Sequence, residues 1–91
     1  MTPGAPYEIR YDPRAAKELG KLDRTVARRV LRVVDALSME PRPAGARALV
    51  GFSGLWRVRV GEYRVVYAVR DDELVVIALR VAPRSEVHRR L

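Results

Sequence analysis

Cysteine is absent from this sequence of 91 residues, and histidine occurs once. A disulfide framework is therefore excluded, and so is a zinc site of cysteine and histidine ligands within one chain. No stretch approaches the roughly 18 consecutive apolar residues of a membrane-spanning helix. The first residues lack the basic and apolar segments of a signal peptide. We expect a soluble, cytoplasmic protein without a cofactor or metal, with residues 1–6 as a flexible lead-in and 7–91 as a single domain.

Acidic residues are scarce relative to basic ones. Eleven Asp and Glu face eighteen Lys and Arg, which gives a formal net charge of +7. A field of this sign attracts polyanions, so in a domain this small it indicates nucleic acid or a strongly acidic protein as a partner. An alternative explanation for the many arginines is the codon usage of a GC-rich genome. That bias explains arginine in place of lysine, but it does not explain the excess of positive charge.

The first half of the chain has the patterns of one strand followed by two helices. Residues 7–11 alternate apolar and polar side chains, which is typical of a short strand. Asp12 as N-cap and Pro13 at the first helical position favour a helix start, and Asp23 can cap a second helix. The prolines and glycine of residues 41–45 predict the end of this helical hairpin. Apolar residues follow the helical period in both segments: Ala15, Leu19 and Leu22, then Val26, Val30, Val33, Val34 and Leu37.

The second half of the chain is rich in β-branched and aromatic residues. Residues 55–60, 63–69 and 74–81 therefore predict three strands, and the short polar connectors between them predict an antiparallel meander. The acidic connector 71–73 offers carboxylates to Mg²⁺, but acidic residues are ordinary in a hairpin turn. The tail after Pro83 predicts a short C-terminal helix. The predicted fold class is α+β: an N-terminal strand, a helical hairpin and the meander, with the helices on one face.

The first strand of this meander carries two arginines on one face. The alternation of side chains places Trp56, Val58 and Val60 on the face that packs under the helices. It places Arg57 and Arg59 on the open face, with Cβ atoms about 7 Å apart, close to the spacing of successive phosphates. This strand is therefore a candidate for binding an anion.

Three more arginines can extend this surface. Arg64 opens the neighbouring strand and can join the pair across the hairpin. Arg80 and Arg84, near the end of the last strand, can converge on the same face. The alternative is a solvated sheet face whose charges serve solubility, as edge strands often show.

Such an arrangement suits one kind of chemistry. When RNA is cleaved without a metal ion, a 2′-hydroxyl attacks the adjacent phosphate, and negative charge accumulates where guanidinium groups can meet it. Arginine is a poor proton acceptor, so a proton carrier must come from elsewhere. His88 is the candidate, because an unperturbed imidazole titrates near neutrality; the alternative is an ordinary exposed histidine near a chain end. Weaker candidates are Glu62, Glu86, Tyr63 and Tyr67.

These residues resemble a known family. Residues 55–67, Leu-Trp-Arg-Val-Arg-Val-Gly-Glu-Tyr-Arg-Val-Val-Tyr, are similar to the central strand pair of RelE-like toxins in the RelE/ParE superfamily of type II toxin–antitoxin systems. The upstream Tyr-x-Ile-x-Tyr-x-Pro-x-Ala and the downstream Val-Ile-x-Leu-x-Val before a basic tail also fit. The resemblance covers residues 7–89 and implies a RelE-like fold.

The resemblance also implies a function and the residues that carry it. It implies a bacterial or archaeal endoribonuclease toxin that cuts mRNA in the ribosomal A site and is silenced by a RelB-like acidic antitoxin in a hetero-oligomeric complex. The two basic residues of the central strand fall on Arg57 and Arg59, and the arginine after the turn falls on Arg64. The tail arginine falls on Arg84, preceded by Ala-Pro where many relatives have Gly-His. The proton-handling aromatic, often a tyrosine, falls on His88.

Two other functions are compatible with the same fold. ParE-like members of the superfamily act on DNA gyrase, and gyrase binding does not require a basic cluster on the open face. A catalytically inactive member would bind RNA or its antitoxin and cut nothing.

Overall fold

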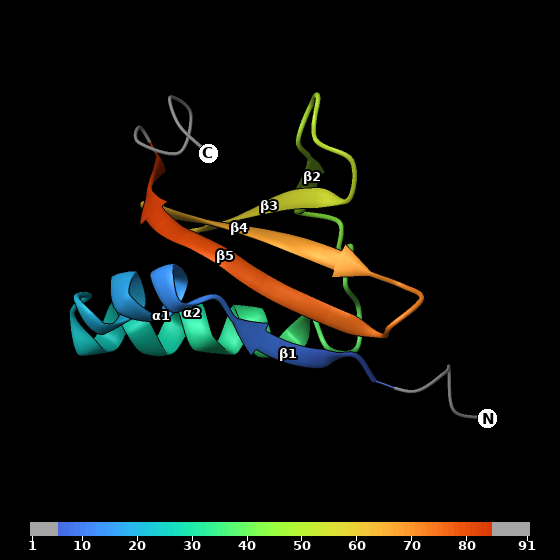
Figure 1. Ribbon diagram of the computed structural model, residues 1–91. Helices are drawn as coiled ribbons and strands as arrows, with labels where there is room; N and C mark the ends of the chain where they lie inside the picture. The colour runs from blue at the N-terminus through green and yellow to red at the C-terminus, as the bar shows by residue number, and fades with distance from the viewer. Residues whose placement is uncertain (1–5, 85–91) are drawn as a thin grey trace.

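The computed structural model of the protein describes residues 6–84. Within that range, two helices cover one face of a five-stranded sheet (Figure 1). The strands lie in the order β1-β5-β4-β3-β2, and neighbours are antiparallel except β1 and β5, which are parallel. The predicted α+β class is therefore confirmed. In chain order, the elements are β1 (Glu8–Tyr11), α1 (Pro13–Gly20), α2 (Arg24–Ala36), β2 (Arg47–Ala48), β3 (Leu55–Val60), β4 (Tyr63–Arg70) and β5 (Val75–Pro83).

Both helices begin where their capping residues predict. The side chain of Asp12 accepts a hydrogen bond from the backbone N–H of Arg14 at 3.0 Å, and Pro13 is the first residue of α1. The side chain of Asp23 accepts from the N–H of Thr25 at 3.1 Å at the start of α2. Each bond satisfies a donor that the first helical turn leaves without a partner. Neither of the described helices has the length and apolar character needed to cross a membrane.

The predicted meander forms the centre of a larger sheet. Strands β3, β4 and β5 pair antiparallel, as expected. β1 joins the far edge in parallel with β5, so that Ile9 lies opposite Val76. At the other edge, β2 pairs with β3 over two residues, too few to show an alternating pattern in the sequence. The C-terminal helix predicted after Pro83 lies outside the described residues, apart from Arg84.

The hydrophobic core lies between the helices and the covered face of the sheet. Val30 and Val34 of α2 are fully buried against Val65 and Tyr67 of β4. The hydroxyl of Tyr67 donates a hydrogen bond to the carbonyl oxygen of Pro41 at 2.8 Å. This bond satisfies the polar end of the largest buried side chain and fixes the segment that follows α2.

A carboxylate from α1 replaces a neighbouring strand along the second half of β5. β1 pairs with β5 only as far as Ala78. Beyond that point, the carboxylate of Glu18 accepts hydrogen bonds from the backbone N–H of Val81 at 2.7 Å and from Nε of Arg80 at 2.9 Å. The side chain of Arg80 is only 4% exposed. This nearly buried ion pair fastens α1 to the end of β5.

Arg80 lies on the same face of the sheet as Arg57, because both residues pair with Val66. Its guanidinium is bound by Glu18. The ladder between β4 and β5 shifts register, because Val66 pairs with Arg80 whereas Tyr67 pairs with Ala78. Leu79 is the extra residue of this bulge. Ala78 and Val81 both pack in the main core although they are three residues apart, so simple alternation fails across the bulge.

Replacing Glu18 tests this contact. Glu18→Ala is expected to lower the free energy of unfolding by about 2–4 kcal/mol, because the N–H of Val81 loses its acceptor and a buried guanidinium loses a carboxylate. Urea denaturation with an unchanged m value would measure the loss. Glu8→Ala is the control, because the Glu8–Arg10 ion pair is exposed, and its midpoint should hardly move. Equal effects of the two substitutions would contradict the assignment.

Candidate nucleic-acid interface

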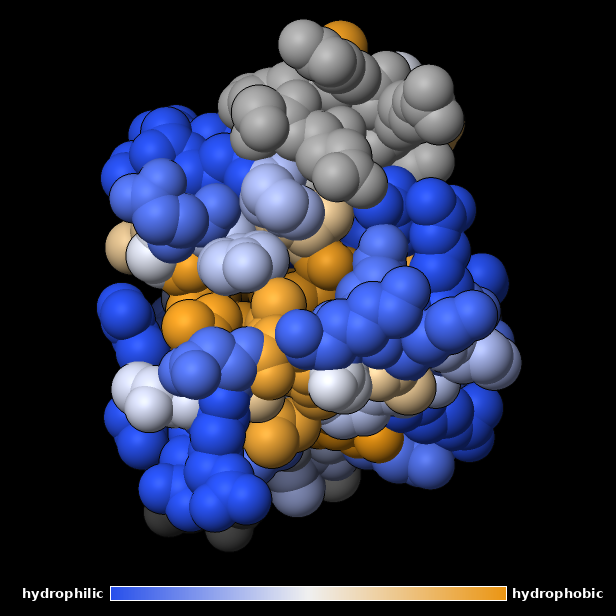
Figure 2. All heavy atoms as spheres, turned by 90° about the vertical axis from the view of Figure 1, so that its left-hand side faces the viewer, coloured by the Kyte–Doolittle hydropathy of each residue, from blue (hydrophilic) through white to orange (hydrophobic). Residues whose placement is uncertain are grey.

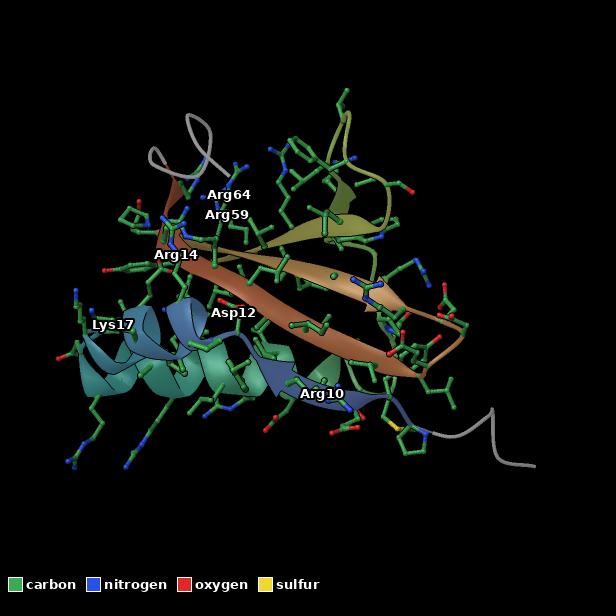
Figure 3. The ribbon with its side chains drawn as sticks, viewed as in Figure 1. Arg10, Asp12, Arg14, Lys17, Arg59 and Arg64 are labelled. Carbon is green, nitrogen blue, oxygen red and sulfur yellow. The ribbon has the colours of Figure 1, made fainter. Side chains whose placement is uncertain are left out.

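The open face of the sheet carries arginines from neighbouring strands. Arg57 and Arg59 project from β3, while Val58 and Val60 are buried on the opposite face, as the alternation predicts. Arg64 of β4 lies directly opposite Arg59 in the antiparallel ladder. Figure 3 shows Arg59 and Arg64 together on the side of the sheet away from α1 and α2. Two strands thus present three guanidinium groups on one surface.

Arg84 joins this surface from the end of β5. Its backbone N–H donates to the carbonyl oxygen of Glu62 at 3.1 Å, which fixes the end of β5 beside the turn between β3 and β4. Burial is the main cause that lowers the pKa of Arg64, and the positive charges of Arg57, Arg84 and Arg59 lower it further. The structure therefore brings together the four arginines to which the family resemblance assigns a role. We refer to these four as the arginine cluster.

β2 adds a further arginine that the sequence patterns missed. Arg47 lies opposite Arg57 in the β2–β3 ladder. With Gly45, Arg57, Arg59 and Arg64, it lines a hollow of about 240 Å³. The sequence does contain a signal for this strand. The segment Ala-Arg-Ala-Leu resembles the start of β3 and stands just before a turn with two glycines, a pattern that is typical of a hairpin.

The arginine cluster has the properties of an anion site. None of the ion pairs within residues 6–84 includes one of its members. Nε of Arg59 donates to the carbonyl oxygen of Gly61 at 3.3 Å, whereas Nε of Arg64 and Nε of Arg84 are buried and find no hydrogen-bond partner in the described part of the chain. Like charges held close together and buried donors without acceptors both cost free energy. A bound phosphate would reduce both costs.

Of the candidate proton carriers, the structure describes Glu62, Tyr63 and Tyr67. His88 and Glu86 lie outside the described residues. Burial raises the pKa of Tyr67 to about 12, and its hydroxyl is held within the core, so it is not available to the open face. Glu62 is exposed in the β3–β4 turn, where its backbone holds Arg84. Tyr63 is half-buried and faces a separate hollow beside α2.

The acidic connector between β4 and β5 is engaged in a structural contact. Asp71 accepts hydrogen bonds from two nitrogens of Arg42, at 2.6 and 3.1 Å, and from the hydroxyl of Tyr7 at 2.6 Å. The hydrogen bonds from Arg42 are the main cause that lowers the pKa of Asp71. The guanidinium carbon of Arg42 also lies 5.5 Å from the ring centroid of Trp56. Within residues 6–84, no three His, Cys, Asp or Glu side chains gather as a metal site would require.

Comparisons with known proteins agree with this geometry. A sequence model described as the ParE toxin of the type II toxin–antitoxin system parDE matches residues 9–88. Toxin RelG of Mycobacterium tuberculosis is 34% identical over 86 residues, which cover 93% of this chain and 99% of the relative. The mRNA interferase toxin RelE of Escherichia coli is 33% identical over 90% of each chain. A solved archaeal RelE–RelB complex from Pyrococcus horikoshii matches with a TM-score of 0.77 and 32% identity, over 92% of this chain and 97% of that one.

These comparisons define the class of this small, basic α+β domain as a toxin of a type II toxin–antitoxin system. The chain belongs to the RelE/ParE family of type II toxin–antitoxin toxins, and its similarity to several RelE proteins makes it a RelE-like member. The family resemblance read from residues 55–67 is thereby confirmed.

Inorganic phosphate provides a direct test of the anion site. A ligand that binds only the folded state stabilises it, by about 1.4 kcal/mol at ten times its dissociation constant, or roughly 6–10 °C in Tm for a domain of this size. Phosphate is expected to raise the Tm of the wild-type protein, and Arg64→Ala should remove most of that shift. Arg28→Ala, at an exposed arginine of α2, is the matched control and should keep the shift. Equal shifts in the wild type and both variants would argue against the site.

Proposed function

We propose that this protein is a metal-independent endoribonuclease that cleaves mRNA and thereby inhibits translation. The observation that carries the proposal is the arginine cluster: four guanidinium groups on an open sheet face, with no carboxylate paired to them within the described residues. The name of the Escherichia coli relative, mRNA interferase toxin RelE, supports a ribonuclease activity in this family. An mRNA substrate also implies that the protein works in the cytoplasm.

In the proposed reaction, the RNA supplies its own nucleophile. The 2′-oxygen attacks the adjacent phosphorus, and the bond from phosphorus to the 5′-oxygen of the next nucleotide breaks. Arg57 and Arg59 hold the scissile phosphate, and Arg64 and Arg84 stabilise the charge of the pentacoordinate transition state. The 2′-hydroxyl loses its proton, and the leaving 5′-oxygen gains one. The products carry a 2′,3′-cyclic phosphate and a 5′-hydroxyl.

His88 is the proposed proton carrier. A neutral imidazole accepts the proton of the 2′-hydroxyl, and the resulting imidazolium can donate a proton to the 5′-oxygen. The arginines cannot do this, because guanidinium stays protonated in proteins. The proposal rests on the family resemblance, in which His88 stands at the position of an aromatic residue that is often a tyrosine.

The ribosomal A site is the proposed place of cleavage. The hollow beside the cluster, at about 240 Å³, is lined by five residues and open to solvent. A surface of this kind holds a phosphodiester but offers few contacts that would orient a flexible RNA strand. Because orientation contributes much of the rate in such reactions, a second surface must position the mRNA, and the ribosome can supply it.

An acidic RelB-like antitoxin is the proposed partner. The archaeal relative was solved as a RelE–RelB complex. Figure 2 shows hydrophobic atoms in the middle of one face, surrounded by hydrophilic residues. Between α2 and the β3–β4 turn lies a hollow of about 260 Å³ whose lining includes Val26, Val60 and Tyr63 as well as Arg29. An acidic amphipathic helix would fit such a surface along the helical hairpin and the margin of the sheet, through apolar contacts flanked by complementary charge.

Mapping RNA ends after induction tests the proposal. Primer extension on cellular mRNA should reveal discrete cuts, and the purified fragments should carry 2′,3′-cyclic phosphate ends. Product ends are a better readout than EDTA on intact ribosomes, since EDTA also strips structural Mg²⁺ from them. Fragments with 3′-hydroxyl and 5′-phosphate ends would indicate hydrolysis by an activated water and contradict the mechanism. Inhibition of gyrase supercoiling without mRNA cuts would instead favour the ParE-like function that the description of the matching family names.

Substitutions separate fixed charge from proton transfer. Arg57→Ala and Arg64→Ala are each expected to slow cleavage by roughly 10²-fold or more at every pH, because they remove permanent positive charge. Arg28→Ala on α2 is the control and should leave the rate unchanged. His88→Ala should cost about 10²–10⁴ in rate and remove the pH dependence that titrates near neutrality. His88→Tyr should recover part of the rate with a shifted pH profile, and full activity of His88→Ala would show that another group carries the proton.

A further inference from the structure

The loop that joins β2 to β3, residues 49–54, presents two apolar side chains to solvent. Phe52, the single phenylalanine of the sequence, is 51% exposed, and Val50 is 96% exposed. An exposed aromatic ring forgoes the free energy that its burial would release. Two such side chains within three residues form an apolar projection on an otherwise strongly charged protein, as a binding surface would require.

The backbone of this loop is held in a defined shape. The N–H of Leu49 donates to the carbonyl oxygen of Leu55 at 3.0 Å, and the N–H of Phe52 donates to that of Leu49 at 3.2 Å. Gly51 and Gly54 have φ angles of +85° and +78°, which side chains with a Cβ rarely adopt. The exposure of Phe52 is therefore a consequence of a hydrogen-bonded turn, so the ring is presented to solvent before any partner arrives.

The loop is fastened to the open face of the sheet. Leu49 packs against Val66 of β4 and Ala82 of β5, which form a small buried cluster separate from the main core. Figure 1 shows the loop rising from the sheet on the side opposite the helices, the same side on which Figure 3 places Arg59 and Arg64. The loop that carries Phe52 and the arginine cluster thus lie on the same side of the sheet.

The loop also lies within reach of the proposed cleavage site. Arg57 is two residues along β3 from Leu55, where the loop ends, and a strand rises about 3.3 Å per residue, so about 7 Å separates the two positions. Arg47, opposite Arg57 in the ladder, leads directly into the loop. An RNA strand whose phosphate is bound by Arg57 therefore passes close to the base of the loop.

We infer that Phe52 is a nucleobase-binding residue, which stacks on a base of the RNA strand held by the arginine cluster. This inference rests on the proposed function, because it takes RNA as the ligand of that cluster. Proteins that bind single-stranded RNA pair a basic surface for the phosphates with aromatic side chains for the base faces. Stacking tolerates any base, so Phe52 adds affinity and orientation and does not select a sequence. The hollow at the cluster is lined by Gly45 and four arginines, and stacking on Phe52 adds an aromatic contact that orients the strand.

The test measures binding of a non-cleavable RNA by the full chain. The probe is a fluorescein-labelled octanucleotide with 2′-O-methyl groups, which cannot supply the nucleophile, and fluorescence anisotropy gives the Kd. Phe52→Ala is expected to raise the Kd by roughly 5- to 100-fold, the range found for loss of one base–aromatic stack. Phe52→Trp should restore wild-type affinity, since tryptophan presents a larger ring. Met39→Ala, at a side chain 64% exposed beyond α2, is the control and should bind as the wild type does.

Abasic probes separate stacking from a general loss of contact. Replacing one nucleotide at a time by an abasic residue should identify a position whose loss weakens the wild type by about the same factor as Phe52→Ala. The same abasic probe should bind the wild type and Phe52→Ala equally, because the two changes remove one interaction. An unchanged Kd for Phe52→Ala, or an abasic effect of equal size in both proteins at every position, would overturn the inference.

The outcomes also distinguish this inference from the proposed function. If Arg57→Ala weakens binding of the octanucleotide and Phe52→Ala does not, the RNA site stands and the stacking role is wrong. If the wild type and Arg57→Ala bind the probe equally weakly, the arginine cluster is not an RNA site, and both conclusions are overturned. If Phe52→Ala binds RNA normally but no longer binds the antitoxin that co-purifies with the wild type, the loop is a protein contact, which also overturns the stacking role.

Discussion

The register of the pairing between β3 and β4 determines which of their side chains enter the core and which form the candidate site. Side chains alternate along each strand, so the register that buries Val58 and Val65 beneath the helices also turns Arg59 and Arg64 outward, opposite each other. A slip of one residue would bury guanidinium groups and expose valines. The same register therefore sets both the stability of the core and the orientation of the arginines. The free energy gained by burying the valines on one face offsets the repulsion between like charges on the other.

The two edges of the sheet are completed in different ways, and both affect the site. At the β5 edge, β1 pairs as far as Ala78, and Glu18 of α1 then takes over the hydrogen bonding and holds Arg80. This contact steadies the end of β5 from which Arg84 reaches the cluster. At the β3 edge, the short strand β2 brings Arg47 beside the cluster and carries the loop of Phe52. The β5 edge thus positions Arg84, and the β3 edge adds the hollow beside Arg47 and the apolar loop.

The chemistry that this surface can support follows from what guanidinium groups do. They hold and stabilise negative charge at every pH, but they do not transfer protons, so in the proposed reaction the arginine cluster would supply only the electrostatic contribution. The lack of paired carboxylates in the cluster would also favour the acidic antitoxin that we propose as the partner. A partner that neutralises the cluster would relieve the repulsion that lowers the pKa of Arg64, and so would the phosphates of a substrate.

The sequence by itself determined the local features of this protein. The helix starts at Asp12 and Asp23, the faces of β3 and the gathering of Arg57, Arg59 and Arg64 all follow from spacing within a few residues, which the backbone geometry of helices and strands dictates. Only the tertiary structure decided the parallel pairing of β1 with β5, the strand that carries Arg47, the contact of Arg80 with Glu18 and the position of the loop that carries Phe52. These features depend on which distant segments pack together, and packing over long separations leaves no periodic trace in a single sequence.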